Sequence, residues 1–250
     1  MQKSPPAKIR LDRLLVDRGV APSRQRAQAL ILAGQVLAGG QKVEKCGAPV
    51  SLDTTVRIVG EPRKYVSRAG VKLEGALDRF GVDPHGKICL DVGASTGGFT
   101  DCLLDRGAAK VFAVDAGTNQ LDWKIRQDPR VVVMEKTNAR YLRVGQLGER
   151  VALTTVDVSF ISATLIVRAM PQLLHPGAEA LILVKPQFEV GREGVGKGGI
   201  VRDPELHRQA VEKVILCLQQ AGFQVSGSCE SSLPGVEGNR EFFVHARWDA

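Results

Sequence analysis

Short apolar runs separated by helical stretches dominate the chain from about residue 65 onward. Strands that alternate with helices form a mostly parallel sheet with both faces covered. We therefore predict a doubly wound α/β domain of the Rossmann-like type. Its predicted strands lie at residues 88–90, 111–114, 131–134, 153–156, 180–184, 223–226 and 242–246.

The first part of the chain has a different pattern. Residues 10–19 and 24–33 are typical of two short helices, which Gly19 and Gly34 would end. Short strand-like segments follow as far as residue 59. We predict a small α+β module over residues 8–60, a linker at residues 61–64, and the α/β domain over residues 65–250.

Positive charge is concentrated in this first part. Residues 1–72 hold 14 Lys and Arg against 5 Asp and Glu, whereas the whole chain carries +7. A basic module beside a near-neutral domain favours binding of a polyanion such as RNA, and the alternative is an ordinary solvated surface. Arg24 and Arg26 lie near a helix start, where cations are mildly disfavoured, which indicates a functional use. The candidate RNA-binding residues are Arg10, Arg24, Arg26, Lys42 and Arg68.

A glycine-rich segment directly follows the first predicted strand of the α/β domain. It begins at Asp91 and contains Gly93, Ser95, Thr96, Gly97 and Gly98. Glycines at this position allow a sharp turn and a close approach to a ligand. A dinucleotide fingerprint would have glycine where Ser95 stands. The Asp91 carboxylate suits a positively charged ligand better than a pyrophosphate.

A second acidic residue supports a nucleoside ligand. Asp115 ends the next strand, where a carboxylate can accept both hydroxyls of a ribose. The combination indicates S-adenosylmethionine, with a nicotinamide cofactor or a simple turn as alternatives. Ser95 and Thr96 are candidates to bind its methionine part. Asn138 is a candidate to bind its adenine, or else an ordinary turn residue.

Other classes of protein are disfavoured. The Gly-rich stretch 191–198 resembles a phosphate-binding loop but has Gly198 where that motif needs Ser or Thr. Five scattered cysteines without metal-ligand spacing argue against a disulfide framework and a metal site. No apolar run reaches membrane-spanning length, and no export signal is recognisable. We expect a cytoplasmic protein without a membrane or metal partner.

Several stretches together resemble the TlyA family, over almost the whole chain from about Arg10 to Trp248. Members resemble a fusion of an S-four-type RNA-binding module with an FtsJ-like methyltransferase domain. The matching stretches are residues 10–12, 23–27, 65–73, 91–100, 157–160, 185–189 and 239–242.

The resemblance implies methylation of a ribose 2′-hydroxyl, on cytidine in ribosomal RNA, with S-adenosylmethionine as methyl donor. It also implies a catalytic tetrad at Lys72, Asp157, Lys185 and Glu241. Lys185 would remove or stabilise the hydroxyl proton and Asp157, which could also contact the cofactor, would orient the lysines. Glu241 would hold Lys72 or the ribose. Phe160 could stack on the target base, although packing in the core is the expected use.

Two other functions stay open at this stage. One is a non-catalytic RNA-binding or ribosome-assembly factor that keeps the fold without the reaction. The other is a membrane-active protein, because TlyA relatives are sometimes labelled haemolysins. The ribosomal subunit, the modified nucleotide and the oligomeric state are not specified by the sequence.

Overall fold

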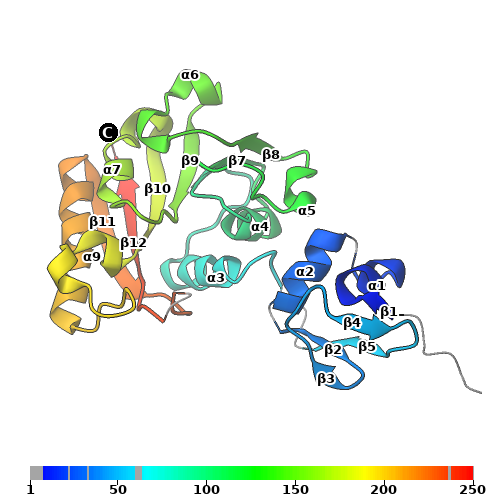
Figure 1. The fold of residues 1–250 in the computed structure, drawn as a ribbon. Coiled ribbons are helices and arrows are strands. Elements are labelled where there is room, and N and C mark those ends of the chain that lie inside the picture. Colours follow the sequence, from blue (N-terminus) through cyan, green and yellow to red (C-terminus); the bar gives the residue numbers. More distant parts are fainter. Residues whose placement is uncertain (1–7, 22, 33, 60–63, 236–237, 250) are drawn as a thin grey trace, which may run out of the picture. The chain divides into compact units, whose positions relative to one another are not determined.

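The computed structural model divides into two compact units, residues 1–62 and residues 63–250 (Figure 1). It describes residues 8–21, 23–32, 34–59, 64–235 and 238–249. The predicted linker at residues 61–64 lies outside the described residues except for Lys64. Each unit is presented by itself.

The first unit is a small α+β fold, as its sequence pattern predicts. Strand β1 (Lys8–Arg10) pairs antiparallel with β4 (Pro49–Ser51), and β2 (Val36–Ala38) pairs with both β3 (Gln41–Lys42) and β5 (Val56–Ile58). Helices α1 (Leu11–Asp17) and α2 (Arg24–Leu32) complete it. The core is formed by Leu11, Leu15, Ala21, Ala27, Ile31, Val36 and Ala38. The sequence pattern did not predict the β1–β4 pair.

A seven-stranded sheet organises the second unit. Its strand order is β11-β12-β10-β9-β6-β7-β8, and the five strands from β10 to β8 are parallel. Strand β12 runs antiparallel to both of its neighbours, so the mostly parallel, doubly wound fold is confirmed. The strands are β6 (Ile88–Val92), β7 (Lys110–Val114), β8 (Val131–Met134), β9 (Val151–Val156), β10 (Leu174–Val184), β11 (Phe223–Glu230) and β12 (Phe242–Trp248).

Helices cover both faces of this sheet, and each face has its own core (Figure 1). One face packs against α3 (Ala69–Phe80), α4 (Gly98–Asp105) and α5 (Trp123–Arg126). The other packs against α6 (Val144–Leu147), α7 (Thr164–Val167) and α9 (Pro204–Gln220). Side chains of one strand alternate between the two cores, because successive residues of a strand point to opposite faces. The remaining short elements are α8 (Pro186–Glu189) and the 3-10 turns η1 (Ala139–Tyr141), η2 (Pro171–Leu173) and η3 (Arg192–Gly194).

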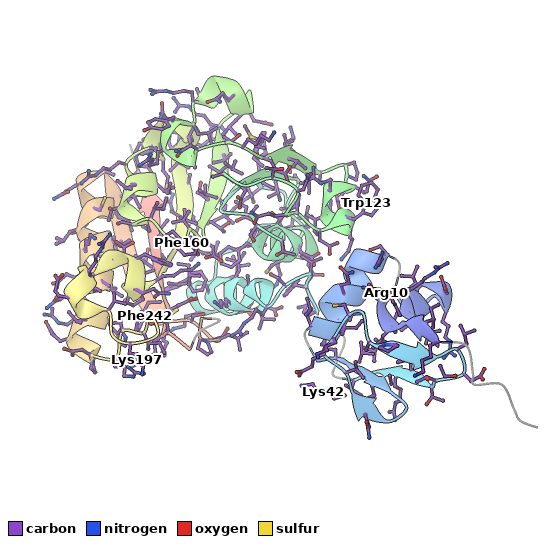
Figure 2. All side chains as sticks on the ribbon, viewed as in Figure 1. Arg10, Lys42, Trp123, Phe160, Lys197 and Phe242 are labelled. Atoms are coloured by element: carbon purple, nitrogen blue, oxygen red, sulfur yellow. The ribbon has the colours of Figure 1, made fainter. Side chains whose placement is uncertain are left out.

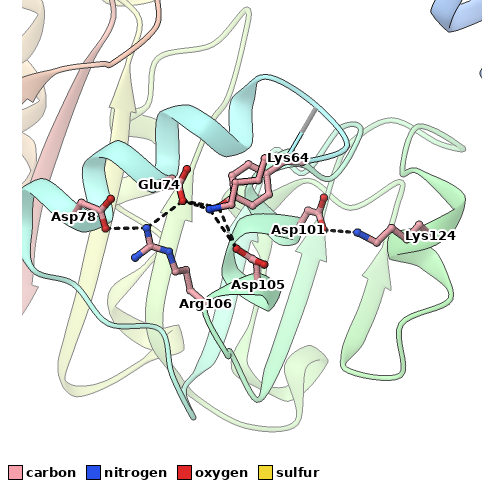
Figure 3. Close-up of polar contacts among 8 residues, drawn as sticks. Lys64, Glu74, Asp78, Asp101, Asp105, Arg106 and Lys124 are labelled. Atoms are coloured by element: carbon pink, nitrogen blue, oxygen red, sulfur yellow. Dashed lines mark hydrogen bonds and ion pairs between the residues drawn. The ribbon is translucent and has the colours of Figure 1, made fainter. Parts of the chain in front are cut away.

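An ion-pair network attaches the first described residues of the second unit to helices α3 and α4 (Figure 3). Glu74 accepts hydrogen bonds from Lys64, the Tyr65 hydroxyl and Arg106. Asp101, in the first turn of α4, accepts the backbone N–H of Val66 at 2.8 Å. The segment that enters this unit is therefore held directly on the helix that follows the glycine-rich loop.

Candidate active site

The glycine-rich loop, residues 93–97, connects β6 to α4 at the carboxyl end of the parallel strands. Gly93 has φ 87°, and a Cβ atom there would lie 2.2 Å from the carbonyl oxygen of Asp157. Only glycine combines this backbone conformation with so close an approach. Gly98 is restricted by space alone, since its Cβ would lie 2.1 Å from the Ser67 hydroxyl oxygen and 3.0 Å from the backbone nitrogen of Gly70. These two glycines thus serve packing within the unit as well as any ligand.

Asp91, just before the loop, connects helix α4 to strand β9 through hydrogen bonds. Its side chain is fully buried and accepts hydrogen bonds from the Thr100 hydroxyl at 2.7 Å and the Thr155 hydroxyl at 3.1 Å. Burial raises the pKa of Asp91 to about 7, and the two hydroxyl donors oppose that rise. The carboxylate therefore faces α4 and β9, whereas the sequence led us to expect it to face a cationic ligand.

Asp115 and Ser95 come together across the ends of two neighbouring strands. Asp115 follows β7 and accepts the backbone N–H groups of Ser95, at 2.8 Å, and Gly117, at 2.7 Å. Ser95 itself has φ 46°, which is uncommon for a residue other than glycine. A carboxylate has about four acceptor positions, so two stay free for ribose hydroxyls.

Two further candidate cofactor residues have structural contacts of their own. The Asn138 side chain accepts the backbone N–H of Arg140 at 3.1 Å and so caps η1. This is the turn role that the sequence left open for it. The Thr96 carbonyl accepts the N–H of Asp122, next to the α5 residues that pack on Gly97.

The four residues of the implied tetrad form two lysine–carboxylate pairs. Lys185 Nζ lies 2.5 Å from Asp157 Oδ1 in an ion pair that is not aligned as a hydrogen bond, and it donates to the Ser159 hydroxyl at 2.8 Å. Lys72 Nζ lies 2.6 Å from Glu241 Oε2. The second pair is buried, with 7% and 4% of the two side chains exposed, and the contact agrees with the expectation for Glu241.

The sheet register explains why distant residues share one edge. Asp157 follows β9, Lys185 follows β10, and Glu241 directly precedes the antiparallel β12. Val184 pairs with Phe242, and Ile182 pairs with Val156. Adjacent strands are about 4.8 Å apart, so the three chain positions lie within about two strand spacings.

Phe160 lies on the surface, and the expectation that it packs in the core is wrong (Figure 2). Its side chain is 89% exposed, with φ 66°. The ring lies beside that of Phe188, with the centroids 5.4 Å apart and the planes tilted by 52°. An exposed aromatic ring three residues from Asp157 can stack on a planar partner.

Two of the candidate RNA-binding arginines are engaged inside the first unit. Asp12 is fully buried and accepts hydrogen bonds from Arg10, Arg24 and Gln28, each within 3.0 Å. Arg24 therefore compensates a buried carboxylate, which gives its position near a helix start a structural reason. Arg10 and Arg24 remain 51% and 60% exposed, so they can also meet phosphates.

The other candidate basic residues have weaker contacts. Lys42 forms an exposed ion pair with Glu44 at 3.0 Å. Arg68, in the second unit, donates to the Pro234 carbonyl at 2.6 Å. The structure places the backbone of Arg26 in α2 and does not describe its side chain.

Sequence reasoning gave no role to two polar residues near the tetrad, Ser159 and Glu189. Ser159 is a hydrogen-bond partner of Lys185, and Glu189 binds the segment after Phe160. Both fall within stretches that carried the family resemblance, 157–160 and 185–189. Their place in these stretches was the available signal that the two residues have a role near the tetrad.

The described residues include neither a metal-binding cluster nor a membrane-spanning helix. Within the described part of the chain, no three His, Cys, Asp or Glu side chains are grouped so that they could hold a metal ion. No described helix is long and apolar enough to cross a membrane.

The fold and the site define a methyltransferase with an attached RNA-binding module. Residues 65–248 match the model of the FtsJ-like methyltransferase family, and residues 9–56 match the S4 domain. The chain belongs to the FtsJ-like methyltransferase family.

Named relatives extend over nearly the whole chain. The 16S/23S rRNA (cytidine-2′-O)-methyltransferase TlyA of Mycobacterium tuberculosis is 47% identical over 96% of this chain and 90% of its own length. Hemolysin A of Brachyspira hyodysenteriae is 42% identical over 95% and 99%. A solved structure from Streptococcus thermophilus, described as a hemolysin, has a TM-score of 0.76 and 41% identity over 98% and 90%. The resemblance stated from the sequence is confirmed.

Proposed function

We propose that this protein transfers a methyl group from S-adenosylmethionine to the ribose 2′-hydroxyl of a cytidine in ribosomal RNA. One observation carries the proposal: two lysine–carboxylate pairs flank the glycine-rich loop at the carboxyl edge of an FtsJ-like sheet. The name of the Mycobacterium tuberculosis relative, a 16S/23S rRNA (cytidine-2′-O)-methyltransferase, supports the choice of cytidine and ribosomal RNA. Work on ribosomal RNA would take place in the cytoplasm.

The residues of the loop fit the proposed cofactor. Backbone groups of Gly93, Ser95, Thr96, Gly97 and Gly98 would surround its methionine part, and the N-terminus of α4 follows directly. Asp115 would accept the ribose hydroxyls and Asn138 would meet the adenine. S-adenosylmethionine supplies a methyl group on a positively charged sulfur. Asp91 would support the loop indirectly, because its hydrogen bonds hold α4 to β9.

The lysine–carboxylate pairs would control the acceptor oxygen. Methyl transfer is an in-line displacement, so alignment of the oxygen supplies much of the rate. Lys185 would bind the 2′-oxygen, and Asp157 at 2.5 Å would hold or receive the proton that Lys185 must lose to act as a base. The buried Lys72–Glu241 pair would fix the other side of the ribose. Phe160 would stack on the target base.

The first unit would supply affinity rather than chemistry. We assign residues 8–60 to RNA binding, residues 61–64 to the linker and residues 65–250 to catalysis. Arg10, Arg24, Arg26, Lys42 and Arg68 would meet phosphates, which position a protein on RNA without reading its sequence. The RNA would be recognised by shape in a folded ribosomal particle.

The test is methyl transfer from labelled S-adenosylmethionine to ribosomal subunits that lack the modification, with the methyl group located by mass spectrometry. We expect label on a cytidine ribose, lowered at least about 100-fold by Lys185→Ala because a positioned acid–base group supplies that much. Lys110→Ala is the matched control, since Lys110 also pairs with a glutamate, Glu149 at 2.6 Å, away from the tetrad. It should retain full activity.

Other outcomes would select other functions. Label on a base would overturn the tetrad chemistry while keeping the cofactor. Specific RNA binding by the wild-type protein, without any label on either subunit, would favour a non-catalytic assembly factor.

A further inference from the structure

Glu189 is a buried carboxylate beside the tetrad that the proposed chemistry does not use. It ends α8, four residues after Lys185, and only 1% of its side chain is exposed. Its Oε1 accepts the backbone N–H of Ala163 at 2.6 Å, and its Oε2 accepts the Ser162 hydroxyl at 2.5 Å. Both partners belong to the connection between β9 and α7.

A lysine from the far helix compensates the charge of this carboxylate. Lys213 of α9 lies 3.2 Å from Glu189 Oε2 and donates to the Glu189 backbone carbonyl at 2.6 Å. Buried carboxylates persist when they are paired and hydrogen-bonded. Both oxygens of Glu189 therefore serve as acceptors for the segment before α7.

The segment that Glu189 holds carries three groups of the proposed site. Residues 157–163 contain Asp157, Ser159 and Phe160. Phe160 has φ 66°, a conformation that a bulky side chain keeps only when its surroundings enforce it. Short α8 contacts this segment at two points, through the Phe188 ring on Phe160 and through Glu189 on residues 162 and 163.

The same helix begins directly after Lys185. The contacts of α8 thus connect the lysine on one strand end to the carboxylate and the aromatic ring on the next. Loss of the Glu189 contacts would leave the Phe160 end of the segment free to move relative to Lys185, while Asp157 keeps its ion pair with Lys185 and its backbone bond to Val92. Misplacement of reacting groups by about 1 Å can cost about 100-fold in rate.

We propose that Glu189 is a positioning residue for methyl transfer, which holds the Asp157–Phe160 segment in register with Lys185. The assignment rests on the proposed function. It predicts that loss of Glu189 lowers turnover at saturating substrate and leaves cofactor affinity unchanged. A purely structural role, as a cap on the start of α7, would lower the melting temperature without changing kcat at temperatures where the protein is folded.

The experiment compares kcat, KM and S-adenosylmethionine affinity for four proteins, at least 15 °C below each melting temperature. Glu189→Leu, which cannot accept either bond, should lower kcat at least about tenfold. Glu189→Gln can still accept from Ala163 and contact Ser162, so its kcat should stay within about threefold of wild type. Glu212→Gln is the matched control on the exposed side of α9, where Glu212 pairs with Arg208, and it should behave as wild type.

Two results would overturn the assignment. One is wild-type kcat from folded Glu189→Leu. If that variant does not fold, Ser162→Ala tests the same bond from its other end, and it should lower kcat about threefold with unchanged cofactor affinity. In that case, wild-type kcat from Ser162→Ala is the second result that would overturn the assignment. Absence of methyl transfer by the wild-type protein would instead overturn the proposed function and this assignment with it.

Discussion

Two fully buried aspartates, one in each unit, show how differently the two units use charge. Asp12 accepts from two arginines and Gln28, and these donors hold its pKa well below its usual value. Asp91 accepts from the hydroxyls of Thr100 and Thr155, and burial raises its pKa to about 7. The pKa of the same residue type thus shifts in opposite directions. Asp12 lies just beneath half-exposed arginines, whose hydrogen bonds outweigh desolvation, whereas Asp91 lies deep in its unit, where desolvation outweighs its hydrogen bonds.

The comparison bears on function as well as on stability. The first unit uses arginines that could serve RNA binding to compensate a buried carboxylate. The second unit supports its loop carboxylate with neutral threonines, and its two tetrad lysines are paired with carboxylates of their own. We infer that the same arginines of the first unit would serve both stability and RNA binding. In the second unit, the buried loop carboxylate and the proposed catalytic lysine–carboxylate pairs are separate groups.

The largest effect on stability is expected from removing the hydrogen bonds of Asp12 with its two arginines. Asp12→Ala removes the acceptor of three side chains and should lower the free energy of unfolding of the first unit by about 3 kcal/mol. Hydrogen exchange of amides in residues 8–59 measures this unit separately. Asp17→Ala is the control, because its ion pair with Arg13 is exposed and should matter little. Equal protection in both variants would contradict the role of Asp12.

The second prediction sharpens the comparison through pH. Between about pH 4 and 7 folded Asp91 is protonated whereas the unfolded residue is ionised, so stability falls as pH rises and levels off above about 7. Asp91→Asn lacks this slope. Its free energy of unfolding relative to wild type should rise by about 2–3 kcal/mol from pH 5 to pH 8. Parallel pH profiles from calorimetry would refute the raised pKa.

Asp12 should show the opposite sign in acid. Its folded pKa is lowered, so its contribution is complete above the unfolded pKa of about 4 and is lost as pH falls below that value. Acid should therefore destabilise the first unit as pH falls below about 4. Amide exchange of residues 8–59 from pH 5 to pH 2 would show this loss in wild type, and the same loss in Asp12→Ala would contradict the role of Asp12.

The smallest effect concerns RNA affinity. Lys42→Ala removes an exposed cation that pairs with the exposed Glu44. It should weaken binding to ribosomal subunits about threefold and reduce the slope of log affinity against log salt by about 1. Arg10→Ala should cost affinity and also destabilise the unit, since Arg10 binds Asp12. Equal effects of the two variants on stability would show that Arg10 has no structural role.

Much of the fold follows from local patterns. The parallel strands at residues 111–114 and 131–134 were predicted at or within one residue of their observed bounds, because each is an uninterrupted apolar run. Strand β10 begins at Leu174, six residues earlier than predicted, since His175, Pro176 and Gly177 interrupt the apolar pattern. The pairing of β1 with β4 is non-local, and three-residue strands have no periodicity to detect.

The sequence by itself determined the α/β architecture, the glycine-rich loop and the basic first unit, and its family resemblance implied the four tetrad residues. Only the tertiary structure decided which lysine pairs with which carboxylate, that Asp91 is buried, that Phe160 is exposed, and that Glu189 holds the segment beside Lys185. Local patterns report burial along one element. Partners and pKa shifts depend on side chains that the sheet register brings together from positions up to 169 residues apart, as for Lys72 and Glu241.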